Sequence, residues 1–254
     1  MRKILLSLAA AAALALPQAA IAQGGPGFMF NRPRVSIGLR TGYVLPTIAS
    51  PLFDDAREWY NLNRFDFDAP YLGGEIAVRV SERWDVALGA GWSRATSRSH
   101  YRDFVEEVGG TPLEIEQDNR FQTVSATLGG RYYFSDRGRR IGRFAWVPSS
   151  VTPFVAAGAG MTLYDLEQAG DFVDQGDPAC PDACPIYTDV LSTDGSGAAV
   201  YAGLGADISL GRQFYFSAEG RYSLASGDVS GQYAGYDDID LSGLQLIAGI
   251  SLRW

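Results

Sequence analysis

Charged side chains recur at alternate positions in several apolar segments of this 254-residue chain. In the segment 74–80, Glu75 and Arg79 share the face opposite to Ile76 and Val78. Charges that face one another in an enclosed space are tolerated when they pair, so this pattern predicts a buried network of ion pairs. The network is expected to contain Arg40, Glu75, Arg79, Asp85, Arg131, Asp207, Glu219, Arg221 and Arg253.

Hydrolytic chemistry would need a histidine held beside a nucleophile. The single histidine, His100, has Ser97, Ser99 and Asp103 as sequence neighbours. A lone histidine in a polar segment is usually solvated, and no catalytic motif surrounds this one. We therefore predict no catalytic residue, no cofactor and no enzymatic activity.

The acidic character of the chain excludes nucleic acid as a partner. Its formal net charge is −8, whereas a phosphate-binding face needs clustered positive charge. Acidic residues are dense in the segment 165–194, but no ordered calcium-loop motif is present there. We predict no metal site and expect a solvated acidic surface, with divalent-cation binding left open.

The charged positions lie in eight segments that alternate apolar and polar residues with a period of two, the pattern of half-buried strands. The segments are 35–40, 74–80, 84–93, 123–134, 155–163, 200–210, 214–223 and 245–254. Most are about ten residues long, the length that a tilted strand needs to cross a bilayer. We therefore predict an all-β fold, a closed antiparallel up-and-down transmembrane β-barrel of about eight strands.

Aromatic residues at the ends of the apolar faces indicate that these faces meet lipid and that the polar faces line the lumen. Amphipathic rings form girdles at both interfaces of outer-membrane barrels. The predicted girdle comprises Trp84, Trp92, Tyr132, Phe134, Phe214, Phe216, Tyr222 and Trp254. The polar faces are rich in glycine, which suits the crowded interior of a narrow barrel.

The connections between the segments alternate in length, as expected for short periplasmic turns and long external loops. The tight turns are 81–83 and 211–213, and the long polar connections are 47–70, 94–119, 165–197 and 225–240. The connection 135–150 departs from this rule, because it should be periplasmic and yet is long. Its basic residues are expected to keep the turn soluble, or else to contact inner-leaflet phosphates or peptidoglycan; they are Arg137, Arg139, Arg140 and Arg143.

Strand direction gives the expected depth of the lumen charges. Four of them, Arg40, Glu75, Glu219 and Arg221, should lie near mid-height, and the other five nearer the periplasmic end. Eight strands leave an interior that side chains can fill. The network therefore either packs the lumen permanently or acts as a gate whose pairs rearrange to open a narrow pore.

The N-terminal segment has the features of an export signal. A positive start, an apolar run and the small-residue site Ala20-Ile21-Ala22 predict a cleaved signal peptide over 1–22. A flexible periplasmic lead over 23–33 and the barrel domain over 34–254 should follow. In the oxidising compartment beyond the inner membrane we expect a disulfide between Cys180 and Cys184, with two free thiols as the alternative.

The Gly-rich strands "VTPFVAAGAGMTLY" and "AAVYAGLGADISL" and the closing strand "LQLIAGISLRW" resemble those of a known family. This family comprises the small eight-stranded outer-membrane barrels, such as the membrane domain of outer membrane protein A and the opacity-type surface proteins. The resemblance implies a place in the Gram-negative outer membrane, among its lipid and lipopolysaccharide. A final strand that ends in an aromatic residue resembles the signal read by the barrel-assembly machinery, although Trp254 stands where phenylalanine is commoner.

The resemblance implies fold and location more than activity. We expect a structural or surface-interacting role in the cell envelope, through long acidic external loops whose ligand the sequence does not name. The alternative is a narrow, porin-like pore or conduit for small or hydrophobic molecules, and a lipid-modifying enzyme is the third possibility. Ten strands remain an alternative to eight, because "TPLEIEQ" in the second long connection would extend a strand or add a hairpin.

Overall fold

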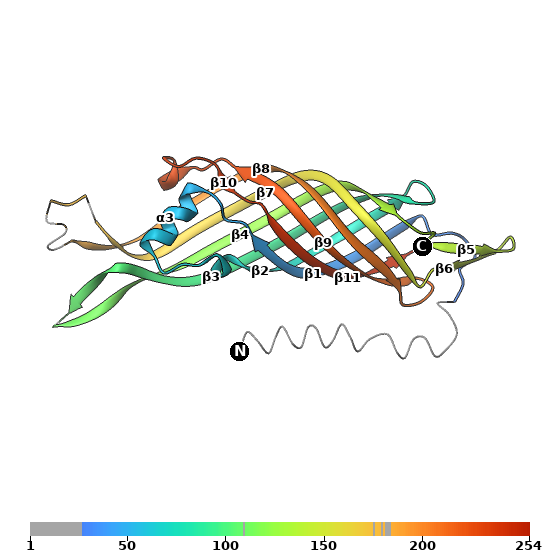
Figure 1. Ribbon diagram of the computed structural model, residues 1–254, viewed down its shortest axis with the longest axis horizontal. Coiled ribbons are helices and arrows are strands. Elements are labelled where there is room, and N and C mark those ends of the chain that lie inside the picture. Colours follow the sequence, from blue (N-terminus) through green and yellow to red (C-terminus); the bar gives the residue numbers. More distant parts are fainter. Residues whose placement is uncertain (1–26, 109, 175, 179, 181–183) are drawn as a thin grey trace.

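The computed structural model describes residues 27–254 except 109, 175, 179 and 181–183. The predicted signal peptide, 1–22, lies outside the described residues, as does the start of the predicted lead. Eight long antiparallel strands dominate the described chain (Figure 1). They are β1 (Val35–Pro46), β2 (Ala69–Arg79), β3 (Trp84–Val108), β4 (Thr111–Tyr133), β7 (Val151–Val173), β8 (Ile186–Ser209), β9 (Phe214–Gly227) and β11 (Gly243–Arg253).

These strands close into a ring, which confirms the predicted barrel. Each strand pairs with the next in the order β1, β2, β3, β4, β7, β8, β9 and β11. Pairing of β11 with β1, from Ser36 opposite Arg253 to Pro46 opposite Gly243, closes the ring. We call the end that carries the tight turns and Trp254 the periplasmic end, and the opposite end the external end.

The period-two pattern decides which side chains enter the lumen. On β2, Ile76 and Val78 lie exposed on the outer wall, while Ala77 is buried inside. Large lumen rings need glycine opposite them: a Cβ on Gly129 would lie 2.1 Å from the hydroxyl of Tyr201. Glycine thus makes room for rings that fill the narrow interior.

Two of the connections that the sequence predicts as long polar loops are mostly strand. Pairing of β3 with β4 continues to Val108 opposite Thr111, with one irregularity between His100 and Val105. Strands β7 and β8 likewise stay paired up to Val173 opposite Ile186. The segment "TPLEIEQ" therefore extends β4, so eight strands, not ten, make the ring. Alternation of buried and exposed residues persists from Ile115 to Phe121 in the extension of β4, and it holds this strand in register.

Together the extensions form a four-stranded external sheet, which we call the platform. Strands β4 and β7 remain paired as far as Gln117 opposite Gly170, so β3, β4, β7 and β8 continue as one sheet to this point. Beyond it they divide into two hairpins, β3–β4 and β7–β8. The other strands of the ring end earlier: β2 last pairs with β3 at Ser93, and β9 last pairs with β8 at Ala199. The platform projects beyond the ring at the left of Figure 1.

The first and fourth external connections fold over the mouth of the barrel instead of forming polar loops. The first contains the helix α3 (Pro51–Trp59) and the 3-10 turn η1 (Arg64–Phe67). The fourth contains η2 (Gly231–Tyr233) and β10 (Ile239–Asp240). No helix in the described part of the chain has the length and apolar character to cross a membrane.

These segments build an apolar cluster at the external mouth, which we call the cap. The ring of Phe53 lies 5.1 Å from that of Phe67 and 5.9 Å from that of Phe121, which projects from β4. Other buried members of the cap are Ile48, Leu52 and Leu62 of the first connection, Tyr164 and Leu166 of β7, and Ile239 of β10. The alternating pattern of strands gave no sign of the cap, because its residues follow no period of two.

The basic periplasmic connection forms a small hairpin of β5 (Gly138–Ile141) and β6 (Ala145–Pro148). It lies at the same end as the C-terminus (Figure 1). Met29 and Trp146 exchange two backbone hydrogen bonds of 2.8 Å. This part of the predicted lead is therefore tied to the barrel.

Replacement of Phe53 by alanine should loosen the cap and leave the ring closed. Large-to-small changes of this kind cost about 3–5 kcal/mol in a packed core, here confined to the external segments. We expect faster tryptic cleavage after Arg57 and Arg64, while the heat-dependent gel shift of the folded barrel persists. The matched control is Phe65→Ala, because Phe65 is 64% exposed; equal cleavage of both variants would contradict the packing role of Phe53.

Candidate functional site in the barrel interior

Five of the predicted charges form one chain of ion pairs across the lumen. The Arg40 guanidinium donates to Glu75 at 2.7 Å, and Arg131 donates to the second oxygen of Glu75 at 2.5 Å. Arg131 also donates to Glu219 at 3.1 Å, and Arg221 donates to the other oxygen of Glu219 at 3.0 Å. These charges come from β1, β2, β4 and β9, so the series of ion pairs connects opposite walls of the barrel.

Arg131 holds this network together from an unexpected depth. The sequence placed it with the periplasmic charges, but its side chain reaches the mid-height glutamates. It is 2% exposed, and its guanidinium also lies 4.8 Å from the ring centre of Phe154. The length of the arginine side chain explains the difference between the predicted and the observed depth, because its guanidinium lies far from the Cα position that strand register indicates.

The network carries more positive than negative charge, with three arginines on two glutamates. Arg40 Nε, Arg40 Nη1 and Arg131 Nη1 are buried without a hydrogen-bond partner among the described residues. Removing one partner of a buried pair costs more folding stability than the pair itself contributes, because the remaining charge is left buried without a partner. The lumen at mid-height is therefore filled by charges that depend on one another.

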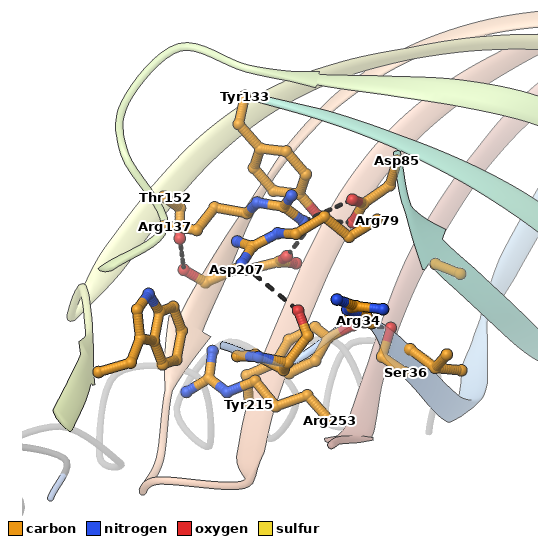
Figure 2. A pocket seen from close by; sticks show the side chains of 14 residues that line it. Arg34, Ser36, Arg79, Asp85, Tyr133, Arg137, Thr152, Asp207, Tyr215 and Arg253 are labelled. Atoms are coloured by element: carbon orange, nitrogen blue, oxygen red, sulfur yellow. Dashed lines mark hydrogen bonds and ion pairs between the residues drawn. The ribbon is translucent and has the colours of Figure 1, made fainter. Parts of the chain in front are cut away.

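The remaining four predicted charges lie in a separate layer at the periplasmic end (Figure 2). Asp85 accepts from Arg137 at 2.6 and 2.5 Å, and Asp207 accepts from the hydroxyl of Tyr133 at 3.0 Å. Arg253 donates to backbone carbonyls of the 211–213 turn, and Arg79 donates to the carbonyl of Pro33 at 3.4 Å. A cavity of about 40 Å³ remains among them.

Sequence reasoning missed two members of this layer. Arg137 was assigned to the soluble basic turn, but it enters the barrel to pair with Asp85. Trp146, from β6, is 4% exposed. The guanidinium carbons of Arg79 and Arg253 lie 5.7 and 5.6 Å from its ring centre. Neither residue belongs to a strand with the alternating pattern. The unusual length of the 135–150 connection was the only feature of the sequence that indicated the periplasmic layer.

The external half of the lumen is closed by the cap. Below the cap, the hydroxyls of Ser93 and Thr123 lie 2.7 Å apart beside a cavity of about 50 Å³. Within the cap, burial raises the pKa of both Tyr60 and Tyr233 above the usual tyrosine range. Both hydroxyls therefore stay protonated at neutral pH and are available for hydrogen bonds, such as that from Tyr233 to Gln168 at 3.2 Å.

The predicted girdle residues all lie on the outer wall. At the periplasmic end, the ring of Tyr132 lies 5.2 Å from Trp84 and 5.7 Å from Phe134. Phe214 and Phe216 lie in the first three residues of β9 at this end, and Trp254 directly follows β11. Trp92 and Tyr222 lie further along β3 and β9, toward the external end, and both are exposed.

The structure does not bring His100 to a serine. Its Nδ1 lies 3.3 Å from a carboxylate oxygen of Glu114. Ser99 points to the opposite face of β3, where its hydroxyl donates to Gln117 at 3.3 Å. Consecutive residues of a strand point to opposite faces of the sheet. The side chains of Ser99 and His100 are therefore on opposite faces of β3 although the residues are adjacent in sequence.

The acidic third connection is divided between strands. Asp165 and Glu167 lie 3.0 and 3.3 Å from Arg120 of β4. In the ranges that the structure describes, no three acidic, histidine or cysteine side chains are grouped to hold a metal ion. Cys180 and Cys184 form a disulfide near the end of the platform, and Cys184 packs against the cluster around Tyr101.

Comparison with models of protein families identifies a family for this chain. The family described as outer membrane protein beta-barrel domain matches residues 5–251. No curated protein sequence matches the chain.

Solved structures that resemble the chain are outer-membrane proteins with low sequence identity. OprG of Pseudomonas aeruginosa is 15% identical with a TM-score of 0.45, covering 89% of this chain and 99% of its own. Outer membrane protein W of E. coli is 17% identical with a TM-score of 0.41, covering 89% and 100%. Ail of Yersinia pestis is 16% identical with a TM-score of 0.40, covering 90% and 99%.

Neutralising Glu219 should destabilise the folded barrel strongly. Glu219→Gln leaves Arg131 and Arg221 buried together with one carboxylate fewer, and removing one partner of a buried pair costs about 3–5 kcal/mol. Urea unfolding of the protein in lipid vesicles, followed by tryptophan fluorescence, measures the loss. The matched control is Asp118→Asn, because Asp118 pairs with Arg98 on the surface and should matter little. Similar unfolding curves for the two variants would show that the network contributes no stability.

Proposed function

The chain belongs to the outer membrane protein β-barrel domain family, and from this premise we propose that it is a closed barrel that anchors a rigid platform for contacts outside the cell. Membership confirms the predicted resemblance and the predicted place in the outer membrane. A specific partner is not part of this proposal, which concerns how the barrel presents its external surface.

Closure of the lumen at three levels carries the proposal. The cap fills the external mouth, with Ile48 and Phe53 each 1% exposed. The ion-pair chain crosses mid-height. The layer around Trp146 fills the periplasmic mouth. A conduit would need a continuous path, whereas the cavities below the cap and within the periplasmic layer measure only about 50 and 40 Å³.

Rigidity of the platform supports a role in contacts. Its strands are hydrogen-bonded far beyond the ring, and a second small cluster of Tyr101, Ile115 and Val173 packs near its end. Apolar residues are exposed among the acidic ones on both faces of these strands; they include Val105, Leu113, Tyr187 and Val190. A preorganised surface loses little conformational entropy when it binds, and exposed apolar residues rimmed by charge are typical of interaction sites.

Catalysis is not part of the proposal. Ser99 and His100 face opposite sides of β3 and have different partners. Lipid, lipopolysaccharide and the assembly machinery that would read β11 remain predicted partners.

A closed barrel should not conduct. We expect no stable single-channel current when the protein, with its heat-dependent gel shift verified, is reconstituted in planar bilayers beside a general porin as positive control. Trp146→Ala should also remain silent, because the mid-height ion pairs persist in that variant. Stable channels formed by the wild type would favour the pore interpretation and reject closure.

Shortening the β3–β4 hairpin of the platform should weaken external contacts without unfolding the barrel. Residues 102–114 would be replaced by Asn-Gly, a two-residue turn that suits a hairpin, between Tyr101 and Ile115. Intact Gram-negative cells that display this variant should adhere less to a panel of immobilised extracellular-matrix proteins than cells with the wild type. Ile141→Ser, a change in the periplasmic hairpin, is the control and should leave adherence unchanged. Equal adherence of the shortened and wild-type proteins would remove the platform from the proposal.

A further inference from the structure

A groove of about 1000 Å³ opens at the periplasmic rim of the barrel. It lies between the segment that leads into β1, the end of β2 and the hairpin strand β5. Its lining joins charged and apolar residues; these include Arg32, Arg34, Arg79, Val80, Arg140 and Trp254.

Positive charge predominates in this groove. Glu82 is the acidic residue of its lining, and it already pairs with Arg32. Arg79 is turned toward Pro33 and Trp146, and its Nε has no hydrogen-bond partner among the described residues. Arg34 and Arg140 are exposed, and neither forms an ion pair with a described residue. Two guanidinium groups are thus available to an anion from outside the chain.

The apolar side of the groove belongs to the lipid-facing wall. Val80 is 61% exposed and continues the outer face that Ile76 and Val78 begin on β2. Trp254 is 53% exposed and continues the outer face of β11 after Ile250. Indole rings at this height are typical of the boundary between acyl chains and headgroups. A molecule in the groove would therefore touch both arginines and the edge of the apolar band.

We propose that this groove binds the headgroup of an anionic phospholipid of the inner leaflet. Arg34 and Arg140 hold the phosphate, since guanidinium groups pair with phosphate oxygens through two parallel hydrogen bonds. Trp254 and Val80 contact the glycerol and the first methylenes of the chains. The apolar border favours a lipid over peptidoglycan, which offers carboxylates on a polar polymer and gains nothing from Val80.

The test is a lipid titration of the purified barrel followed by native mass spectrometry. The probe is dioleoyl phosphatidylglycerol, with dioleoyl phosphatidylcholine as the lipid that lacks net charge. The wild type should bind phosphatidylglycerol more tightly. The double variant Arg34→Gln/Arg140→Gln should lose that preference, with an affinity for phosphatidylglycerol lower by about fivefold for each arginine removed. Its affinity for phosphatidylcholine should fall less, because the choline ammonium already offsets the charge of that phosphate.

Arg143→Gln is the matched control, because Arg143 lies in the same hairpin and does not line the groove. The double variant should keep its gel shift, since the Arg34 amide, which donates to Trp254 at 2.8 Å, is untouched. An unchanged affinity in the double variant, or an equal loss in Arg143→Gln, would overturn the proposal. So would a double variant that stops co-sedimenting with peptidoglycan sacculi while its lipid affinity is unchanged, because the groove would then contact the cell wall.

Discussion

The positive charge of Arg131 sets the main constraint on this barrel. A fully buried guanidinium must find carboxylates, because water cannot stabilise it in the packed lumen. It meets this need by reaching from β4 to Glu75 on β2 and Glu219 on β9. A ring of eight strands is narrow enough for one side chain to span this gap. The cap and the Trp146 layer then keep water from competing for the same carboxylates.

The strands and their faces were predictable because one physical rule governs them. Every transmembrane strand of a barrel turns one side to lipid and one to the lumen, so the sequence repeats with a period of two. That rule assigned Glu75, Glu219 and Ile76 to the correct sides of the wall. It also placed the charges of the lumen, although the reach of Arg131 depended on side-chain length that periodicity does not record.

The residues that close the barrel were not predictable from periodicity. Phe53, Phe67 and Trp146 lie in connections, where tertiary packing decides the conformation and no repeat reveals it. The extensions of β3 and β4 were anticipated only at the segment "TPLEIEQ", as one of two alternatives, for a different reason. Beyond the bilayer both faces meet water or other protein segments, so polar residues such as Gln117 and Asn119 replace apolar ones and the segment is read as a loop.

The platform leaves the ring with two unpaired strand edges, one on β3 and one on β8. The first connection covers part of one edge: the Asn61 amide donates to the carbonyl of His100 at 3.1 Å, and the Asn61 side chain accepts from the His100 amide. The fourth connection covers part of the other, where Gln232 accepts from the Ser192 amide. Open edges invite sheets of neighbouring molecules to fuse. By occupying these amides within its own chain, the protein leaves fewer of them open to pairing with the strand of a neighbouring molecule.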